Sequence, residues 1–204
     1  MRYDADHKQS TRARIVESAA KVLRRDGIAT TGVASLMAEA GLTNGAFYAH
    51  FDSKEALVAE AVVAALQETG AVFARKIREA APGQGLDALV NHYLDPRHVT
   101  YPERGCAVAA LGPELARRPD ATRAFVGQAI DELVAIFADA LPAGHRDAMA
   151  VARAVFASLV GTIQLARTCD PSLIPVVLEA GAIAARTIGQ LPGAESQPAQ
   201  AKVS

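Results

Sequence analysis

Small and hydrogen-bonding residues cluster between positions 43 and 54 of the chain. Asn44, Tyr48 and His50 are spaced so that a short helix would carry them on its exposed side, and Lys54 follows at the start of another helix. An amide bonds adenine bidentately in the major groove, and phenol, imidazole and ammonium groups suit the phosphate backbone of DNA. The pattern therefore predicts contact with duplex DNA. The alternative is a helical corner that serves only packing.

The first helix that must position these residues is predicted over residues 33–40, where apolar residues recur at helical spacing. Thr31 is expected to cap its start. Gly41 is expected to end it, because glycine tolerates the left-handed backbone of many helix ends, and Leu42 then turns inward.

The second helix is predicted over residues 44–50, with Thr43 as its cap. Phe47 and Phe51, four residues apart, share one face and pack on the first helix. The residues left to point outward are Thr43, Asn44, Gly45, Ala46, Tyr48 and His50. Ser53 is expected to cap a third helix.

This stretch resembles the signature of the TetR family of one-component transcriptional regulators, T-x-x-x-x-[LI]-[AM]-x-x-A-G-[VL]-[ST]-x-G-x-[LF]-Y-x-[HY]-F-x-[SN]-K-E-x-L. The matching residues are Leu36, Met37, Ala40, Gly41, Leu42, Thr43, Gly45, Phe47, Tyr48, His50, Phe51, Ser53, Lys54, Glu55 and Leu57. The resemblance is strong over residues 11–66 and general beyond them.

The resemblance implies a homodimer that binds a near-palindromic operator and is released by a small molecule. Carried over to this chain, it places Asn44 and Ala46 at base edges, and Thr43, Gly45, Tyr48 and His50 at bases or phosphates. It also places Lys54 and the cap at Thr31 on the DNA backbone.

Composition predicts an all-helical protein. Half of the 204 residues are hydrophobic, but only 5% are aromatic and none is Trp. Much of the apolar content is alanine, which favours closely packed helices over sheet. The formal net charge of -1 excludes a protein that is basic over its whole surface, so DNA contact requires local asymmetry.

Basic residues are concentrated near the N-terminus. A helix is predicted over residues 11–25, ended by Gly27, after a polar and loosely ordered arm that reaches about Gln9. The basic residues of this segment, assigned to its outer surface, are Lys8, Arg12, Arg14, Lys21, Arg24 and Arg25. A solvated face is their default interpretation, and phosphate contact near the start of the segment is the alternative.

The chain is predicted to form an all-α fold of about nine helices in two domains. Residues 1–57 form a three-helix helix-turn-helix DNA-binding domain. By the resemblance, residues 58–191 form a helical ligand-binding and dimerisation domain. Residues 192–204 are small and polar and are expected to be disordered. A long helix from Ser53 to about Ala80 joins the two domains.

Further helices are predicted over residues 86–94, 105–119, 120–141, 147–168 and 171–190, with a loop over 97–104. Asp120 is expected to cap the third of these helices. Bulky and small residues alternate in the last two helices, which permits close helix approach. By the resemblance, these two helices from each chain form the homodimer interface; the alternative is that they face the chain's own core.

Cys106 is the main candidate for a reactive side chain in the body. After Gly105, at a predicted helix start and beside Arg104, its thiol is expected to favour the thiolate and to react with electrophiles or oxidants. A buried, inert cysteine is the favoured interpretation, and a reactive thiolate that senses electrophiles is the alternative. The candidate pocket residues are Val72, Phe73, His92, Tyr93, Tyr101, Cys106, Phe125 and Gln128.

Motifs of catalysis, cofactor binding and metal binding are not found in the sequence, so no enzyme, cofactor or metal is expected. Cys106 and Cys169 form no Cys-x-x-Cys pair, which favours a reducing cytoplasm. The longest apolar run, residues 154–166, contains polar residues and is flanked by arginines, so we expect no membrane span. Because the first twelve residues are polar, we also expect no secretory signal.

The residues and the resemblance together predict a ligand-responsive transcriptional regulator. The favoured form is a cytoplasmic repressor that binds a palindromic operator as a homodimer and is released by a small molecule or an electrophile. The alternatives are an activator of the same fold, and a helical ligand-binding protein or enzyme with a vestigial DNA-binding head. The predicted partners are double-stranded operator DNA, a small-molecule effector and a second copy of the chain, with no membrane.

Overall fold

The computed structural model describes residues 2–143, 145 and 147–191, and the predicted disordered tail, 192–204, lies outside this range. Every regular element within it is a helix, which confirms the all-α prediction. The first elements are α1 (Arg2–Asp26), α2 (Val33–Glu39), the 3-10 helix η1 (Asn44–Ala49) and α3 (Lys54–Glu79). They are followed by α4 (Gly85–Tyr93), α5 (Pro96–Thr100), η2 (Pro102–Arg104), α6 (Ala107–Leu115), α7 (Asp120–Ala140), α8 (Ala148–Thr168), η3 (Pro171–Leu173) and α9 (Ile174–Gln190).

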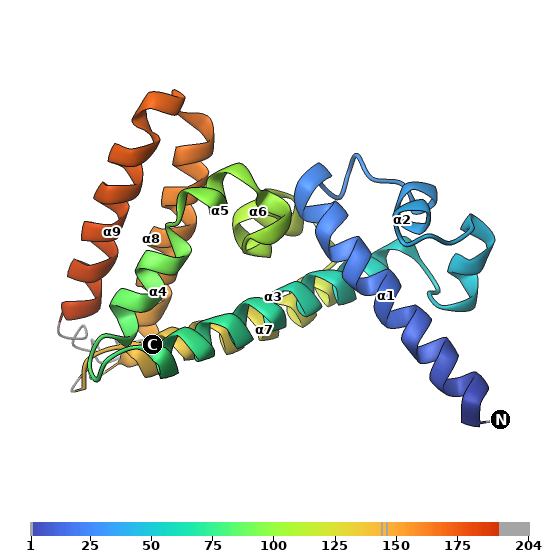
Figure 1. The fold of residues 1–204 in the computed structure, drawn as a ribbon, viewed down its shortest axis with the longest axis horizontal. Coiled ribbons are helices and arrows are strands. Elements are labelled where there is room, and N and C mark those ends of the chain that lie inside the picture. The colour runs from blue at the N-terminus through green and yellow to red at the C-terminus, as the bar shows by residue number, and fades with distance from the viewer. Residues whose placement is uncertain (1, 144, 146, 192–204) are drawn as a thin grey trace, which may run out of the picture.

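The molecule is elongated, with a head and a body joined by long helices (Figure 1). The head holds α1, α2 and η1, and the N-terminal end of α1 projects away from the rest. From the head, α3 runs beside α7 toward the far end, where α4, α8 and α9 gather. Helix α3 continues without a break across residues 57 and 58, so the predicted domain boundary falls inside one rigid element.

The head is held together by an apolar core that its short helices share. Ile15 and Leu23 of α1, Leu36 of α2 and Phe47 of η1 are each buried almost completely. Gly27 ends α1 as predicted, with a φ of +87° that favours glycine. Ser53 caps α3 as predicted, because its hydroxyl accepts a hydrogen bond of 3.1 Å from the amide of Ala56.

The start of α1 corrects the prediction of a loosely ordered arm. The helix begins at Arg2 and includes the residues assigned to the arm. Residues 2–14 contain neither glycine nor proline, and adding a turn to an existing helix costs far less than nucleating a new one. The apolar stripe begins only near Ile15, so periodicity alone gave a helix that was too short.

Two predictions in the body are also wrong in detail. The predicted loop over residues 97–104 is largely helical, as α5 and η2, because Asp95 caps α5 and Pro96 starts it; both helices are too short to show periodicity. Asp120 does not cap α7. Pro119 occupies the cap position, and the carboxylate of Asp120 pairs with Arg123 at 2.6 Å instead.

Helices α8 and α9 pack closely within the body. A Cβ atom added at Gly181 would lie 2.3 Å from side-chain atoms of Thr162, so the two backbones approach as only glycine permits. The alternative, in which these helices face the chain's own core, therefore holds for their inward faces, and the homodimer interface stays a prediction. Their outward faces remain apolar, with exposed side chains at Leu165 of α8 and at Val176 and Ile183 of α9.

Three segments of the described part, Lys54–Glu79, Ala148–Thr168 and Pro171–Gln190, are long and apolar enough by length and composition to cross a membrane. The sequence predicts no membrane span. That prediction considered uninterrupted apolar runs, whereas Ser158 and Thr162 lower the mean hydropathy of α8 only slightly. The apolar side chains of these helices contribute to one protein core, for example Leu66, Leu159 and Leu178.

Candidate functional site

The candidate site begins with η1, which presents a polar edge and hides an apolar one. Thr43, Asn44 and Gly45 are exposed, and 74% of Tyr48 is accessible. The inward residues, Phe47 and Phe51, are buried, with stacked rings whose centroids lie 5.8 Å apart. Residues 44–50 were predicted to be a helix; the short segment instead winds as a 3-10 helix.

The turn between α2 and η1 fixes the orientation of this edge. Gly41 has a φ of +70°, and its amide donates to the carbonyl of Ala38 at 3.0 Å. The amide of Leu42 donates to the carbonyl of Met37 at 2.9 Å, which closes the left-handed helix end expected from the sequence. The ring of Tyr48 stands edge-on to that of Phe47, with centroids 5.2 Å apart, so the buried residue orients the exposed one.

Gly45 lies on the exposed edge without any packing constraint. A Cβ atom added there would meet no atom of another described residue within 4 Å, and its φ is not in the left-handed region. The fold therefore does not require glycine at this position. A surface that another molecule must approach closely does favour it.

Cations surround the end of η1. His50 is half-buried, and burial, followed by the neighbouring charges of Lys8 and Arg12, lowers its pKa. Arg12 lies over the ring of Phe51 at 4.6 Å and pairs with Glu60 at 2.5 Å. The extension of α1 thus brings basic residues beside the exposed edge of η1, where they suit a phosphate backbone.

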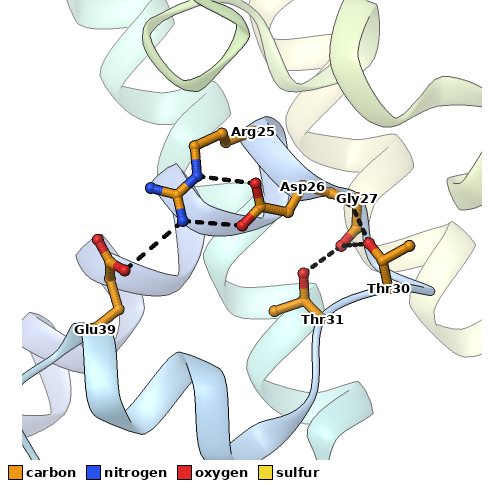
Figure 2. Close-up of polar contacts among 6 residues, drawn as sticks. All are labelled: Arg25, Asp26, Gly27, Thr30, Thr31 and Glu39. Carbon is orange, nitrogen blue, oxygen red and sulfur yellow. Dashed lines mark hydrogen bonds and ion pairs between the residues drawn. The ribbon is translucent and has the colours of Figure 1, made fainter.

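Thr31 does not have the predicted capping role. Gly32 occupies the cap of α2, and Thr31 is buried with its hydroxyl donating to the carbonyl of Gly27 at 2.6 Å (Figure 2). The side chain therefore stabilises the loop between α1 and α2, and its contact with the DNA backbone stays a prediction. Figure 2 also shows Arg25 bridging Asp26 and Glu39, which ties α1 to α2.

Lys54 also stabilises the loop between α1 and α2. Its ammonium donates to the carbonyl of Ile28 at 2.7 Å. This contact makes Lys54 a positioning residue for the loop, and its direct contact with DNA stays a prediction.

Three ties between the head and the body were not predicted from the sequence. The carboxylate of Glu114 on α6 accepts hydrogen bonds from the amides of Ile28 at 3.1 Å and Ala29 at 2.7 Å. Glu55 on α3 pairs with Arg118 and accepts from the hydroxyl of Thr122 at 2.7 Å. Of the residues that form these two ties, only Glu55 belongs to the TetR-like signature, so only Glu55 could have been singled out from the sequence. Neither Glu114 nor Arg118 belongs to a periodic or turn pattern.

Arg24 forms the third tie and corrects its assignment to the outer basic face. It is only 6% exposed and donates to the carbonyl of Gly105 at 3.2 Å. Its position four residues after Ala20, which is also buried, places it on the inner side of α1. Burial lowers the pKa of its guanidinium, which the charge of Glu68 opposes.

The body contains a cavity of about 290 Å³ between α1, α3 and the α4 to η2 segment. Six of the candidate pocket residues line it, namely Val72, Phe73, His92, Tyr93, Tyr101 and Cys106. Phe125 and Gln128 do not; both are exposed on α7. Helical spacing alone does not show which face of α7 a residue occupies, and contact of Phe125 and Gln128 with a ligand stays a prediction.

Cys106 lines this cavity but lacks the predicted thiolate character. It is 2% exposed, and burial raises the pKa of its thiol. Arg104 does not activate it, since its guanidinium lies over the ring of Tyr101 at 5.5 Å. The structure therefore supports the favoured interpretation of a buried cysteine and opposes the thiolate that an electrophile sensor would need.

His98 is fixed beside Cys106 by its two ring nitrogens. Nδ1 lies 2.8 Å from the carbonyl of Tyr93, and Nε2 accepts the amide of Cys106 at 3.0 Å. An acceptor role for Nε2 requires the neutral imidazole with its proton on Nδ1. Burial is the main cause that lowers the pKa of His98 to about 4. Within the described residues, no group of three or more His, Cys, Asp or Glu side chains is placed to hold a metal ion.

Comparisons with known proteins agree on one family. A profile described as "Bacterial regulatory proteins, tetR family" matches residues 15–61. The regulator TtgR of Pseudomonas putida is 39% identical over 75 residues, which cover 37% of this chain and only 35% of that relative. An uncharacterised HTH-type transcriptional regulator of Mycobacterium tuberculosis is 30% identical over 173 residues, covering 78% of this chain and 85% of the relative.

The solved structures extend the likeness to the body. The crystal structure of a TetR transcriptional regulator from Chloroflexus aurantiacus superposes with a TM-score of 0.73 at 25% identity. The match covers 91% of this chain and 97% of the other. The head and the helical body therefore occur together in one known architecture.

Proposed function

The chain belongs to the TetR family of transcriptional regulators, and on this premise we propose that it is a repressor that binds a palindromic operator as a homodimer and is released by a small molecule. Proteins of this family are soluble DNA-binding regulators that act as dimers and bind small molecules. No enzyme family is indicated by the comparisons. We further propose that the protein acts in the cytoplasm, where an operator would be accessible.

The exposed edge of η1 is the observation that supports DNA binding most directly. A slim helix with a buried aromatic back and the small residues Thr43, Asn44 and Gly45 on its outer edge fits a major groove. We propose that Asn44 and Ala46 face base edges. Thr43, Gly45, Tyr48 and His50 would meet bases or phosphates.

The outward faces of α8 and α9 support dimerisation. Leu165 of α8 and Val176 and Ile183 of α9 are all exposed in the single chain. Apolar side chains gathered on adjacent helices are typical of an interface. We propose that the two helices of each subunit form a four-helix interface, which would present two heads about 34 to 36 Å apart, one turn of DNA.

The cavity in the body supports the proposed response to a ligand. It lies against Arg24, and therefore against the helix that carries the basic residues of the head. A ligand changes DNA affinity only by preferring one of two dimer shapes. Because Cys106 is buried and burial raises the pKa of its thiol, we propose that the effector binds reversibly and does not react with this thiol.

A binding assay with DNA from upstream of the protein's own gene tests the DNA-binding proposal. We expect a dissociation constant of about 10 nM or lower at physiological salt. Unlabelled operator DNA should displace the labelled fragment, and unrelated DNA should displace little of it. Tyr48→Ala is expected to weaken binding to all sequences, and Asn44→Ala to relax preference at one base pair by about 1–3 kcal/mol.

The matched control for these two variants is Phe125→Ala, which removes an exposed aromatic side chain from the body. Equal DNA affinity of the wild type and Tyr48→Ala would contradict the docking of η1 in the groove. A reporter gene placed behind the bound region decides between repression and activation, because the sign of regulation appears directly in its expression.

A further inference from the structure

The cavity beside α1 contains a buried cation with too few partners. The guanidinium of Arg24 offers five N–H donors, and its side chain is almost fully buried. One donor bonds the carbonyl of Gly105 at 3.2 Å, and the nearest carboxylate oxygen, on Glu68, is 4.0 Å away. Glu68 itself is mostly exposed, and Nε of Arg24 has no hydrogen-bond partner among the described residues. Buried charges are normally paired, so this environment is electrostatically incomplete.

A second buried donor lines the same cavity. Tyr93 is 2% exposed, and its hydroxyl, which lies close to the thiol of Cys106, makes no well-formed hydrogen bond to any described residue. Its pKa is raised by burial, so the hydroxyl stays protonated and remains a donor. Arg24, Tyr93 and Cys106 all line this cavity.

The other cations at the cavity are already engaged. Arg97 forms two hydrogen bonds to the carboxylate of Asp95, at 2.9 and 2.7 Å, and is exposed. Arg104 lies over the ring of Tyr101 at the surface. Arg24 is therefore the buried positive charge of the cavity that remains available to a ligand.

The remaining lining supplies an apolar surface. Val72 and Phe73 of α3 line the cavity together with the ring of Tyr93, whose centroid lies 6.1 Å from that of Phe73. Aromatic and aliphatic walls with a few convergent polar groups are typical of sites for small organic ligands. A cavity of about 290 Å³ accommodates a ligand of roughly ten to fifteen heavy atoms.

We propose that this cavity binds a small organic monocarboxylate with an apolar body, whose carboxylate accepts hydrogen bonds from Arg24 and from the hydroxyl of Tyr93. The proposal deepens the effector role assigned above and rests on it. Arg24 belongs to α1 and also holds Gly105, directly before α6. A carboxylate on its guanidinium would therefore act on the contact between head and body.

The test uses the full-length protein without DNA and measures direct binding by calorimetry. The probes are benzoate, 2-naphthoate and octanoate, each compared with its own primary amide, which has the same shape and no charge. Charge-assisted hydrogen bonds are about twice as strong as neutral ones, so we expect the carboxylates to bind at least about tenfold more tightly than the amides.

Variants separate the proposed contact from general effects. Arg24→Gln keeps an amide donor for the carbonyl of Gly105 and removes the charge, so it is expected to abolish the preference for carboxylate. Arg25→Gln, on the next residue of the same helix and outside the cavity, is expected to preserve it. Tyr93→Phe removes only the hydroxyl and is expected to reduce carboxylate affinity about three- to tenfold.

Equal affinities for carboxylate and amide, or binding of neither at millimolar concentration, would overturn the proposal. A preference that survives Arg24→Gln would overturn it as well. If Arg24→Gln does not fold, the amide comparison and Tyr93→Phe still decide the result. Because no DNA is present, failure here leaves the operator-binding assay untouched, and failure of that assay leaves the ligand measurement interpretable.

Discussion

At the residue scale, Gly45 is a position where the fold does not require glycine, whereas close approach of DNA would favour it. Its backbone conformation is open to any residue and its surroundings leave room for a methyl group. Alanine has the higher helix propensity, so Gly45→Ala is expected to leave stability unchanged or raise it by up to about 1 kcal/mol. The added methyl group would nevertheless hold the DNA away from η1.

We therefore expect Gly45→Ala to lower operator affinity while its denaturation midpoint stays the same or rises. Fluorescence anisotropy with labelled DNA and urea denaturation measure the two quantities on one preparation. Gly127→Ala, at another helical glycine whose added Cβ meets no described atom within 4 Å, is the matched control and is expected to affect stability alone. Unchanged affinity in Gly45→Ala would show that DNA does not approach this edge.

His98 makes the stability of the body dependent on pH. Burial lowers its folded-state pKa from 6.5 to about 4, so the unfolded chain binds the additional proton first as the pH falls. The contribution of the neutral imidazole to the free energy of unfolding is complete above about pH 6.5 and is lost progressively toward pH 4. The expected loss over that window is about 3 kcal/mol.

Urea denaturation at several pH values, compared between wild type and His98→Gln, measures this contribution. Glutamine does not titrate, so the difference between the two proteins isolates His98 from the other ionisable groups. The free energy of unfolding of the wild type, relative to that of His98→Gln, is expected to decrease as the pH falls from 7 toward 4. A difference that stays constant from pH 7 to pH 4.5 would contradict the assignment of a neutral, buried imidazole.

At the element scale, α6 is the part of the body that holds the loop between α1 and α2. Glu114 accepts two backbone amides from this loop, and Gly105 and Cys106, directly before α6, border the cavity. Glu114→Gln retains one carbonyl acceptor but turns an amide group toward a backbone donor. We expect it to destabilise the protein by about 1–3 kcal/mol.

Glu132→Gln provides the comparison, because Glu132 is exposed on α7 and its substitution is expected to change stability by less than about 0.5 kcal/mol. Urea denaturation of both variants measures the difference. Similar stabilities would mean that the contact between α6 and the loop contributes little, and α6 would then be a weak candidate for carrying a ligand's effect to the head.

At the scale of the whole molecule, the outward faces of α8 and α9 decide whether two heads can act together. Ile183→Glu places a charge on the exposed apolar face of α9, where burial in an interface would cost several kcal/mol. We expect this variant to be monomeric at concentrations where the wild type is dimeric, and to lose most of its operator affinity.

Sedimentation velocity measures the oligomeric state of this variant. Phe125→Glu places the same charge on an exposed aromatic position of α7 and is expected to leave the dimer intact. A dimer that persists in Ile183→Glu would exclude this part of α9 from the interface. Membership of the family would be unaffected, because it rests on the sequence and on the whole fold.

Local sequence determined the helices and the edge of the candidate site. Gly27 and Gly41 end helices through their own backbone freedom, Ser53 caps α3 three residues from its partner, and Phe47 and Phe51 turn inward because they lie four residues apart. Each of these features depends on near neighbours in the chain. These helix ends, this cap and these inward-facing residues can therefore be predicted from the local sequence.

Tertiary structure alone decided what holds the head to the body and where a ligand would bind. Arg24 meets Gly105 across 81 positions, and Glu114 meets Ile28 across 86. Contacts over such separations cannot be predicted from local spacing. The four-residue spacing from Ala20 is compatible with an inner position for Arg24, but only the tertiary structure shows that a partner is there. The burial of Cys106 likewise depends on helices that are distant in the chain, and burial reversed the chemistry expected of its thiol.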